Sequence, residues 1–460
     1  MTELTSLTAS KLGPLIKEKQ VSPVELMEET FERINKLDST LNAYITLLPD
    51  YALEKAQQAE KDIMRGLYKG PLHGIPIGIK DNYYTKGITT TVGSKIFQDY
   101  IPDSTATAVE KLLCAGGIMT GKLNMHEFGG GLTNTNHTYG NARNPWNVNY
   151  MPGGSSGGSG AALAAGLATL ATGTDTFGSI RVPASMCGLY GLKPTYGLVS
   201  TEGVAPLSWS MDHAGPMARS IDDLALMLQY MAGYDPEDPG SIKAPIPDYK
   251  KGYGRGIKGL KIGVPTYFME GLDADVEEMF NKAIATLQQM GAEILYLTIP
   301  SLTMSSYAAY LIVPAEASAY HYENLQQKPR QFETDVRVFF ETGVVMSGAQ
   351  YVRSQQIRRK MTEALKAAFE KVDLLIGPTI PIAPQPFHPN WVQQNLEIIE
   401  RCMPFTSPAN LTGIPSLNVP MGLSEDGLPL GMQLMGNHLT ENLLLQVGRE
   451  WEKTDPLIEK

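Results

Sequence analysis

The strongest constraint on the fold is an alternation of strand-like and helix-like segments that starts near residue 70 of this 460-residue chain. The first clear strand covers residues 74–79, where apolar residues alternate with glycine and proline, and it ends at Lys80. Segments with helical spacing of apolar residues then alternate with short apolar runs, up to a last helix expected at 440–452. This alternation predicts an α/β protein with one large mixed, mostly parallel β-sheet and helices on both faces.

The first 66 residues look different, because they contain helical patterns only. Ser22 is followed by Pro23 and, three residues after the serine, by Glu25. This is the signature of a helix N-terminus with a capping box. A second helix is expected to stop at Gly66. We therefore expect a single domain over 1–460, consisting of a helical N-terminal arm, a core and a remainder: 1–66, 70–220 and 221–460.

The composition argues against several classes of protein. Acidic residues outnumber basic ones by 48 to 38, which gives a formal net charge of −10. A nucleic-acid-binding protein normally carries a basic face, and the longest basic run is only residues 358–360, so no nucleic-acid partner is expected. The 3 cysteines and 7 histidines lack metal-ligand spacing, so neither a metal nor a cofactor is expected. No signal peptide or bilayer-length apolar run is present, which predicts a cytoplasmic protein without a membrane partner.

The densest glycine cluster is Gly153–Gly160, with the sequence GGSSGGSG. A flexible linker, a phosphate-binding loop and the nucleophile elbow of an α/β-hydrolase are alternative interpretations. Apolar, structured-looking sequence on both sides disfavours the linker, and no Gly-Lys-Ser/Thr follows, as a phosphate loop requires. The elbow needs a strand directly before it, whereas residues 147–152 have the composition of a turn.

Two further features suggest catalysis. In a second glycine-rich segment, residues 173–184, Ser179 directly follows Gly178. A sharp turn there could direct several N–H groups toward one point, as an oxyanion hole requires, although a plain β-turn is an alternative. Lys80 ends an apolar strand. Burial would lower the pKa of Lys80 and make its neutral amine available as a base, so that Lys80 and a serine could form a catalytic unit.

In combination, these segments resemble the amidase signature family, a group of serine hydrolases that act on amide C–N bonds. The resemblance extends over about residues 5–450. The stretches that carry it are 74–82, 153–161, 174–184, 188–195, 211–216, 373–379 and 408–420. The resemblance implies the amidase-signature fold and an amidase that forms an acyl-enzyme and releases ammonia or an amine.

The family's catalytic unit is a Ser–cis-Ser–Lys triad. By motif, the resemblance implies Lys80 as the base, Ser155 as the bridging serine and Ser179 as the nucleophile. It also implies that the Gly154–Ser155 peptide is cis. Neutral Lys80 would take a proton from Ser155, and Ser155 would take one from Ser179 as Ser179 attacks the amide carbonyl.

The resemblance implies three further groups of residues. The oxyanion hole would be formed by backbone N–H groups of four consecutive residues: Thr176, Phe177, Gly178 and Ser179. The substrate pocket would be bordered by Gly129, Gly130, Gly131 and Phe177. Asp175 and Arg181 would support the catalytic loop, either as an orienting ion pair or as a plain structural salt bridge.

This chain departs from the family at two places that concern the substrate. Phe177 stands where most relatives have glycine, which would narrow the pocket or add an apolar wall. The closest rival within the family is the A subunit of glutamyl-tRNA(Gln) amidotransferase, a glutaminase that passes ammonia to a partner and binds the charged groups of glutamine with an Arg and an Asp. Arg358 matches that Arg, but 403–405, Met-Pro-Phe, stand at the position of the Asp. We therefore expect a stand-alone amidase for an uncharged amide, with the amidotransferase glutaminase as the alternative. The expected partners are a small-molecule amide and at most a second copy of the chain.

Overall fold

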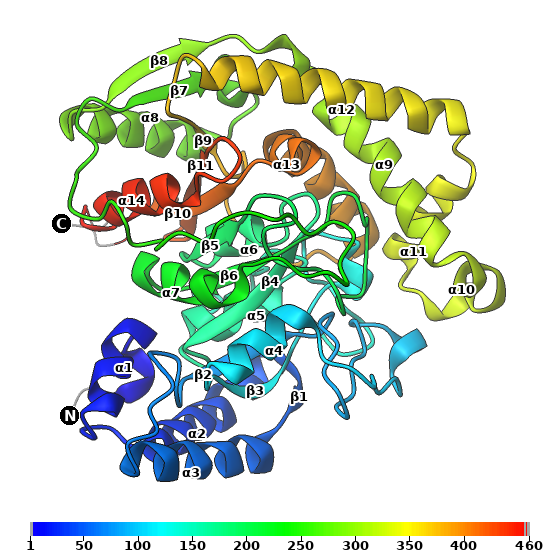
Figure 1. Cartoon of the computed structure of the whole chain (residues 1–460). Coiled ribbons are helices and arrows are strands. Elements are labelled where there is room, and N and C mark those ends of the chain that lie inside the picture. Colours follow the sequence, from blue (N-terminus) through cyan, green and yellow to red (C-terminus); the bar gives the residue numbers. More distant parts are fainter. Residues whose placement is uncertain (1–2, 455–456, 458–460) are drawn as a thin grey trace.

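The computed structural model describes residues 3–454 and 457. Its strands are β1 (Tyr44–Leu47), β2 (Pro76–Lys80), β3 (Ile118–Leu123), β4 (Leu170–Asp175), β5 (Tyr190–Lys193), β6 (His213–Ala218), β7 (Lys261–Pro265), β8 (Glu293–Leu297), β9 (Leu374–Pro378), β10 (Ser416–Leu423) and β11 (Pro429–Met435). These strands form one 11-stranded sheet in the order β1-β3-β2-β4-β6-β5-β10-β11-β9-β7-β8 (Figure 1). The sheet therefore joins strands from both halves of the sequence.

The sheet is mixed, which confirms the α/β class, but parallel pairing does not dominate. β2 is parallel to both β3 and β4, and β7 is parallel to both β8 and β9. Of the 10 pairings between described strands, 4 are parallel and 6 are antiparallel. The expectation of a mostly parallel sheet is wrong, because short connections such as residues 424–428 between β10 and β11 return the chain antiparallel to itself.

Helices cover both faces of the sheet. They are α1 (Ala9–Lys17), α2 (Pro23–Leu41), α3 (Pro49–Met64), α4 (Thr107–Cys114), α5 (Gly157–Ala164), α6 (Arg181–Met186), α7 (Ile221–Met231), α8 (Ala274–Gln289), α9 (Ser305–Tyr320), α10 (Tyr322–Gln327), α11 (Thr334–Val344), α12 (Gly348–Phe369), α13 (Trp391–Thr412) and α14 (Glu441–Glu452). In β9, Leu374 and Ile376 pack into the apolar core shared with α7, α8 and α14. Leu375 instead packs into the core shared with α9 and α11–α13. Successive side chains of a strand point to opposite faces, so one core lies on each side.

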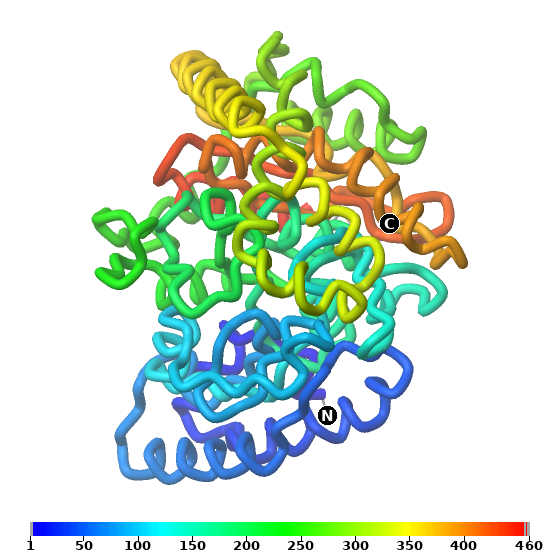
Figure 2. Tube along the Cα trace, turned by 90° about the vertical axis from the view of Figure 1, so that its right-hand side faces the viewer, coloured from blue at the N-terminus to red at the C-terminus, as the bar shows by residue number. Residues whose placement is uncertain are grey.

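The N-terminal helices α1–α3 lie at one end of the molecule, and α12 lies at the other end (Figure 2). Ser22 caps α2, since its side chain accepts hydrogen bonds from the N–H groups of Val24 and Glu25, and the capping box is complete. The arm is not only helical, however, because it contributes β1, which pairs antiparallel with the edge of β3. The sequence-based prediction also differs at α4, which begins at Thr107 rather than directly after Ser104.

The fold brings the segments that were predicted to be catalytic to one edge of the sheet. β2 ends at Lys80, and the neighbouring parallel strand β4 ends at Asp175. Because parallel strands end at the same edge, the segments that follow them meet there. In the ranges 3–454 and 457, no helix is both long and apolar enough to cross a membrane.

Candidate active site

Lys80 is a buried lysine at the end of β2. Its side chain is fully buried, and its Nζ lies 2.8 Å from Ser155 Oγ and 2.8 Å from Thr174 Oγ1. Burial lowers the pKa of Lys80 to about 7, although the charges of Asp175 and Asp212 act in the opposite direction. A large fraction of Lys80 is therefore a neutral amine near pH 7, which can accept a proton.

Ser155 lies in a tightly packed turn rather than in a flexible linker. The Gly154–Ser155 peptide is cis, and α5 begins two residues later, at Gly157. A Cβ added at Gly154 would lie 2.8–3.0 Å from backbone atoms of residues 131–134. Only glycine allows this close approach of the two backbones, and the contact fixes the position of Ser155 next to Lys80.

Ser179 lies in the turn between β4 and α6. Its side chain is 1% exposed, and its Oγ has no hydrogen-bond partner among the described residues. The carbonyl of Ser179 accepts a hydrogen bond from the N–H of Ser156 at 3.3 Å, which joins the two serine segments. Gly178 has a φ of 131°, and an added Cβ would lie 2.9 Å from both Val182 and Thr406. This turn therefore requires glycine directly before the serine.

Asp175 and Arg181 form a buried ion pair, with 3.0 Å between Asp175 Oδ2 and Arg181 Nε. Burial alone would raise the pKa of Asp175, but the Arg181 guanidinium and the Asn410 amide hold that pKa well below its usual range. The same carboxylate accepts the N–H of Gly178 at 2.7 Å and that of Ile180 at 3.2 Å. The ion pair thus directly shapes the turn that contains Ser179.

These contacts change the expected oxyanion hole. The N–H of Gly178 is directed at Asp175, so it is not available in this geometry to an oxyanion. The N–H groups of Phe177 and Ser179 have no acceptor in the described part of the chain. The side chain of Thr176 donates to Asp212 at 2.5 Å, which anchors the start of the same turn.

The residues predicted to border the pocket occupy different positions. A Cβ added at Gly129 would lie 3.6 Å from Ser155 Oγ, so this glycine approaches a predicted catalytic side chain. Gly130 instead faces Val336 of α11, and Gly131 faces His126 and Asn395. Phe177 is fully buried, and its ring meets that of Phe339 on α11 edge-on at 6.3 Å.

The sequence analysis did not identify two residues whose side chains contact the predicted site, Thr174 and Asp212. Thr174 Oγ1 accepts a hydrogen bond from Asn82 Nδ2 at 3.0 Å as well as lying against Lys80. Asp212 accepts the N–H of Leu207 at 2.9 Å and the hydroxyl of Thr176, and burial raises its pKa to about 6. Both lie inside the quoted family stretches, but their side-chain contacts cross between separate segments and leave no spacing signal.

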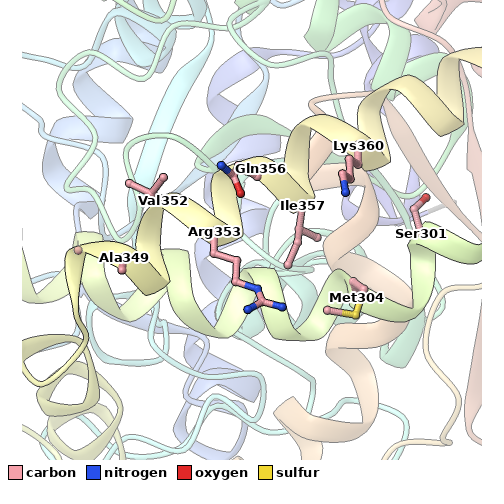
Figure 3. Close-up of a pocket in the computed structure, with 9 residues that line it drawn as sticks. Ser301, Met304, Ala349, Val352, Arg353, Gln356, Ile357 and Lys360 are labelled. Carbon is pink, nitrogen blue, oxygen red and sulfur yellow. The ribbon is translucent and has the colours of Figure 1, made fainter.

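Among the described residues, hollows large enough for a small ligand or a peptide segment include a cleft near Asp212 and a groove beside α12. A cleft of about 820 Å³ reaches Asp212 and is lined by tyrosines and by Trp209. A groove of about 770 Å³ lies between residues 301–304 and the first half of α12, with Arg353 and Lys360 among the residues that line it (Figure 3). This groove contains none of the residues Lys80, Ser155 and Ser179.

Residues 25–445 match the family model described as Amidase. The chain therefore belongs to the amidase family and is a hydrolase acting on amide C–N bonds. It is 41% identical to the A subunit of glutamyl-tRNA(Gln) amidotransferase from Geobacter sp. (strain M21), over 98% of each chain.

Two solved structures give the same picture of the fold. The peptide amidase from Stenotrophomonas maltophilia is 30% identical, with a TM-score of 0.86 over 98% of this chain and 97% of that chain. A protein from a vestigial complex, described as revealing the evolutionary origins of an s-triazine catabolic enzyme, is 33% identical, with a TM-score of 0.91 over 97% of this chain and 98% of that chain.

The relatives' names overturn the expectation about partners. We expected a small-molecule amide, no nucleic acid and at most a homodimer. Relatives from several bacteria are named as subunits of an amidotransferase for glutamyl-tRNA(Gln). Subunits work with other proteins, so the restriction to a small molecule and a second copy is wrong.

Proposed function

We propose that this chain hydrolyses a carboxylic amide through an acyl-enzyme on Ser179, with Ser155 and Lys80 as the proton relay. One observation carries the proposal. A fully buried lysine amine lies 2.8 Å from Ser155 Oγ, and the adjoining turn holds a buried Ser179 Oγ that no described residue engages. The depressed pKa makes the Lys80 amine available as the base. The proton transfer from Ser179 to Ser155 further requires their hydroxyl groups to come within hydrogen-bond reach when the substrate binds.

The proposed reaction begins when Ser179 Oγ attacks the amide carbonyl carbon. The proton of Ser179 passes to Ser155 Oγ, whose own proton passes to Lys80 Nζ. The developing oxyanion is bound by the N–H groups of Phe177 and Ser179, with that of Thr176 as a further candidate. One such donor is worth about 3–4 kcal/mol of transition-state stabilisation.

The C–N bond then breaks, and the relay returns a proton from Lys80 through Ser155 to the leaving nitrogen. Ammonia or an amine departs, and Ser179 remains esterified. Water attacks the ester with Lys80 and Ser155 acting again as base, which releases the acid and restores the serine. In this scheme Asp175 and Arg181 hold the turn, and Gly129 borders the acyl group.

For the amide itself, the first candidate is glutamine, with ammonia passed to a partner protein, as expected of a glutaminase within an amidotransferase of the relatives' kind. The identity of 41% over 98% of both chains supports this candidate. Arg358 supports it further, because only three of its five N–H groups are directed at protein oxygens. These oxygens are Leu411 O at 2.6 Å, Ser210 Oγ at 3.0 Å and Ser210 O at 2.6 Å. The two other N–H groups of Arg358 remain to bind the carboxylate of a glutamine substrate.

The second candidate is an uncharged apolar or aromatic amide, hydrolysed without a partner. Met403 favours it, since this fully buried methionine lies on α13 where the family's acid was expected. Met403 also lies one turn before Thr406, whose hydroxyl donates to the carbonyl of Phe177. An apolar residue at this place cannot pair with the ammonium group of glutamine.

The test is a panel of amides incubated with the purified chain: glutamine, aliphatic amides and aryl amides, with ammonia or amine release as the readout. Preference for glutamine supports the first candidate, and preference for uncharged amides supports the second. A Ser179→Ala variant is the control. Because one member of a complex can be inactive alone, labelling of Ser179 by a fluorophosphonate is measured in parallel. Failure of wild type to react by either route, or equal reaction of Ser179→Ala, would refute the proposal.

A further inference from the structure

The loop His126–Gly131, here called the glycine loop, is docked along most of its length on the segment Phe332–Phe340, here called the brace. The contact at its start is polar. His126 Nε2 lies 3.0 Å from Asp335 Oδ2, and both side chains are fully buried. These two residues are 209 positions apart in the sequence, so only the folded chain brings them together.

The next residues of the glycine loop also contact the brace. Glu127 Oε2 accepts the N–H of Glu333 at 2.7 Å. The ring of Phe128 packs at 5.5 Å from Phe332 and 6.3 Å from Phe340. These contacts combine an apolar cluster with buried hydrogen bonds, a combination that defines one position for the loop.

The end of the loop is fixed by α13. Asn395 Nδ2 donates to Asp335 Oδ2 at 2.8 Å, while Asn395 Oδ1 accepts the N–H of Leu132 at 3.1 Å. Asp335 Oδ2 therefore receives two polar contacts, from His126 and from Asn395, while Asp335 Oδ1 accepts the N–H of Val336. A Cβ added at Gly131 would overlap the His126 ring, so the ring packs directly against Gly131 and leaves no space for a side chain there.

The opposite side of the glycine loop contacts the catalytic segment. The N–H of His126 donates to the carbonyl of Ser155 at 3.1 Å, and Gly129 lies against Ser155 Oγ. One residue, His126, thus binds Asp335 through its ring and Ser155 through its backbone. The brace reaches the nucleophile turn as well, where Phe339 meets Phe177.

We propose that His126 and Asp335 are positioning residues for amide hydrolysis, which place Ser155 at the correct distance from Lys80 and Ser179. The inference rests on the proposed function, because it assigns a role within that reaction. Ser155 Oγ must serve two proton transfers in succession, so its position is critical. Misplacement of a catalytic group by about 1 Å is enough to lower a rate about 100-fold. Both side chains are fully buried, so neither Asp335 nor His126 can replace its partner with bulk water.

The test compares three variants of the full-length chain. Asp335→Ala removes the acceptor, and Asp335→Asn keeps an acceptor oxygen of the same shape. Glu341→Gln is the matched control, since Glu341 lies on the same helix in an exposed pair with Arg337. The readouts are the rate of Ser179 labelling by a fluorophosphonate, the kcat and KM for the best amide of the panel, and the melting temperature.

We expect Asp335→Ala to slow labelling and kcat by about 10- to 100-fold with little change in KM. Asp335→Asn should recover most of the loss, and Glu341→Gln should match wild type. A merely structural pair would lower the melting temperature and leave the labelling rate of the folded protein unchanged, which would overturn the inference. If Asp335→Ala does not fold, His126→Leu decides the question, and a wild-type labelling rate in His126→Leu would overturn the inference.

This outcome differs from a failure of the proposed function. If wild-type Ser179 neither hydrolyses an amide nor reacts with the fluorophosphonate, the reaction scheme is wrong whatever the Asp335 variants do. If wild type reacts and Asp335→Ala reacts equally fast, the scheme stands and the positioning role is wrong.

Discussion

The lowered pKa of Lys80 predicts that the activity and the stability of the protein both rise as the pH increases through about 7. At pH 7 an ordinary lysine with a pKa of about 10.5 is neutral in only about 0.03% of molecules. Burial lowers the pKa of Lys80 to about 7, so about half of the molecules carry the neutral amine at that pH. If the neutral form is the base, kcat/KM should rise about tenfold between pH 6 and pH 8 and then level off.

The effect on stability comes from the same proton on Lys80, compared between the folded and the unfolded chain. Between pH 7 and 10.5 the unfolded chain binds a proton at this lysine that the folded chain does not bind. The free energy of unfolding therefore rises with pH across this window. The shift from 10.5 to about 7 corresponds to about 5 kcal/mol over the whole window, and to about 2 kcal/mol between pH 7 and pH 9. Below pH 7 the burial penalty of the charged amine is present in full.

Lys80→Met removes the titrating group while keeping an apolar side chain of similar length. We expect this variant to be inactive, and we expect its unfolding free energy to gain about 2 kcal/mol less than that of wild type between pH 7 and pH 9. Urea denaturation at the two pH values measures the difference, and Lys80→Arg, which stays charged, is a second inactive control. Equal pH dependence of stability in wild type and Lys80→Met, or activity of Lys80→Met at pH 7, would refute the reasoning.

Three further predictions concern the nucleophile turn. Asp175→Ala should lower the free energy of unfolding by about 3–5 kcal/mol, because it leaves the Arg181 guanidinium buried without its counterion; urea denaturation that matches wild type would contradict this. Gly178→Ala should slow Ser179 labelling by about 100-fold, since the turn has a φ of 131° and no space for a Cβ; a normal labelling rate would show that the turn adapts. Phe177→Ala should cost about 3–5 kcal/mol of stability and raise kcat/KM for bulky amides relative to small ones, whereas an unchanged ratio would place the ring outside the substrate pocket.

Much of the predicted catalytic site could be located from the sequence, because short stretches of residues determine where a strand ends and where the backbone turns. Lys80 directly follows an apolar run, and β2 ends there. The glycines around Ser155 and Ser179 mark turns where no Cβ fits, as the contacts of Gly154 and Gly178 show. Residue type and spacing record such requirements, so the sequence alone predicts where the backbone bends sharply and which serines the bends present.

Strand direction could not be recognised in the same way. Nearly every residue of β4, β6, β10 and β11 is buried. These strands are therefore buried on both faces, and their sequences do not show whether they run parallel or antiparallel to their neighbours. The one available signal was the connection 424–428, because a parallel pair needs a crossover of about a dozen residues. The hydrogen bond from the N–H of Gly178 to Asp175 could not be predicted from the sequence either, since it depends on how tightly the turn closes.

The contact between His126 and Asp335 could not be predicted from the sequence either, yet it connects α11 to the segment of Ser155. No local pattern links a histidine before a glycine run to an aspartate 209 residues later. In the structure, Asp335 and Phe339 are four residues apart on α11 and so lie on the same face of this helix. Asp335 contacts the glycine loop beside Ser155, and Phe339 contacts Phe177 beside Ser179. A single rigid helix turn therefore spans the two serine segments. A shift of α11 would therefore move both contacts together.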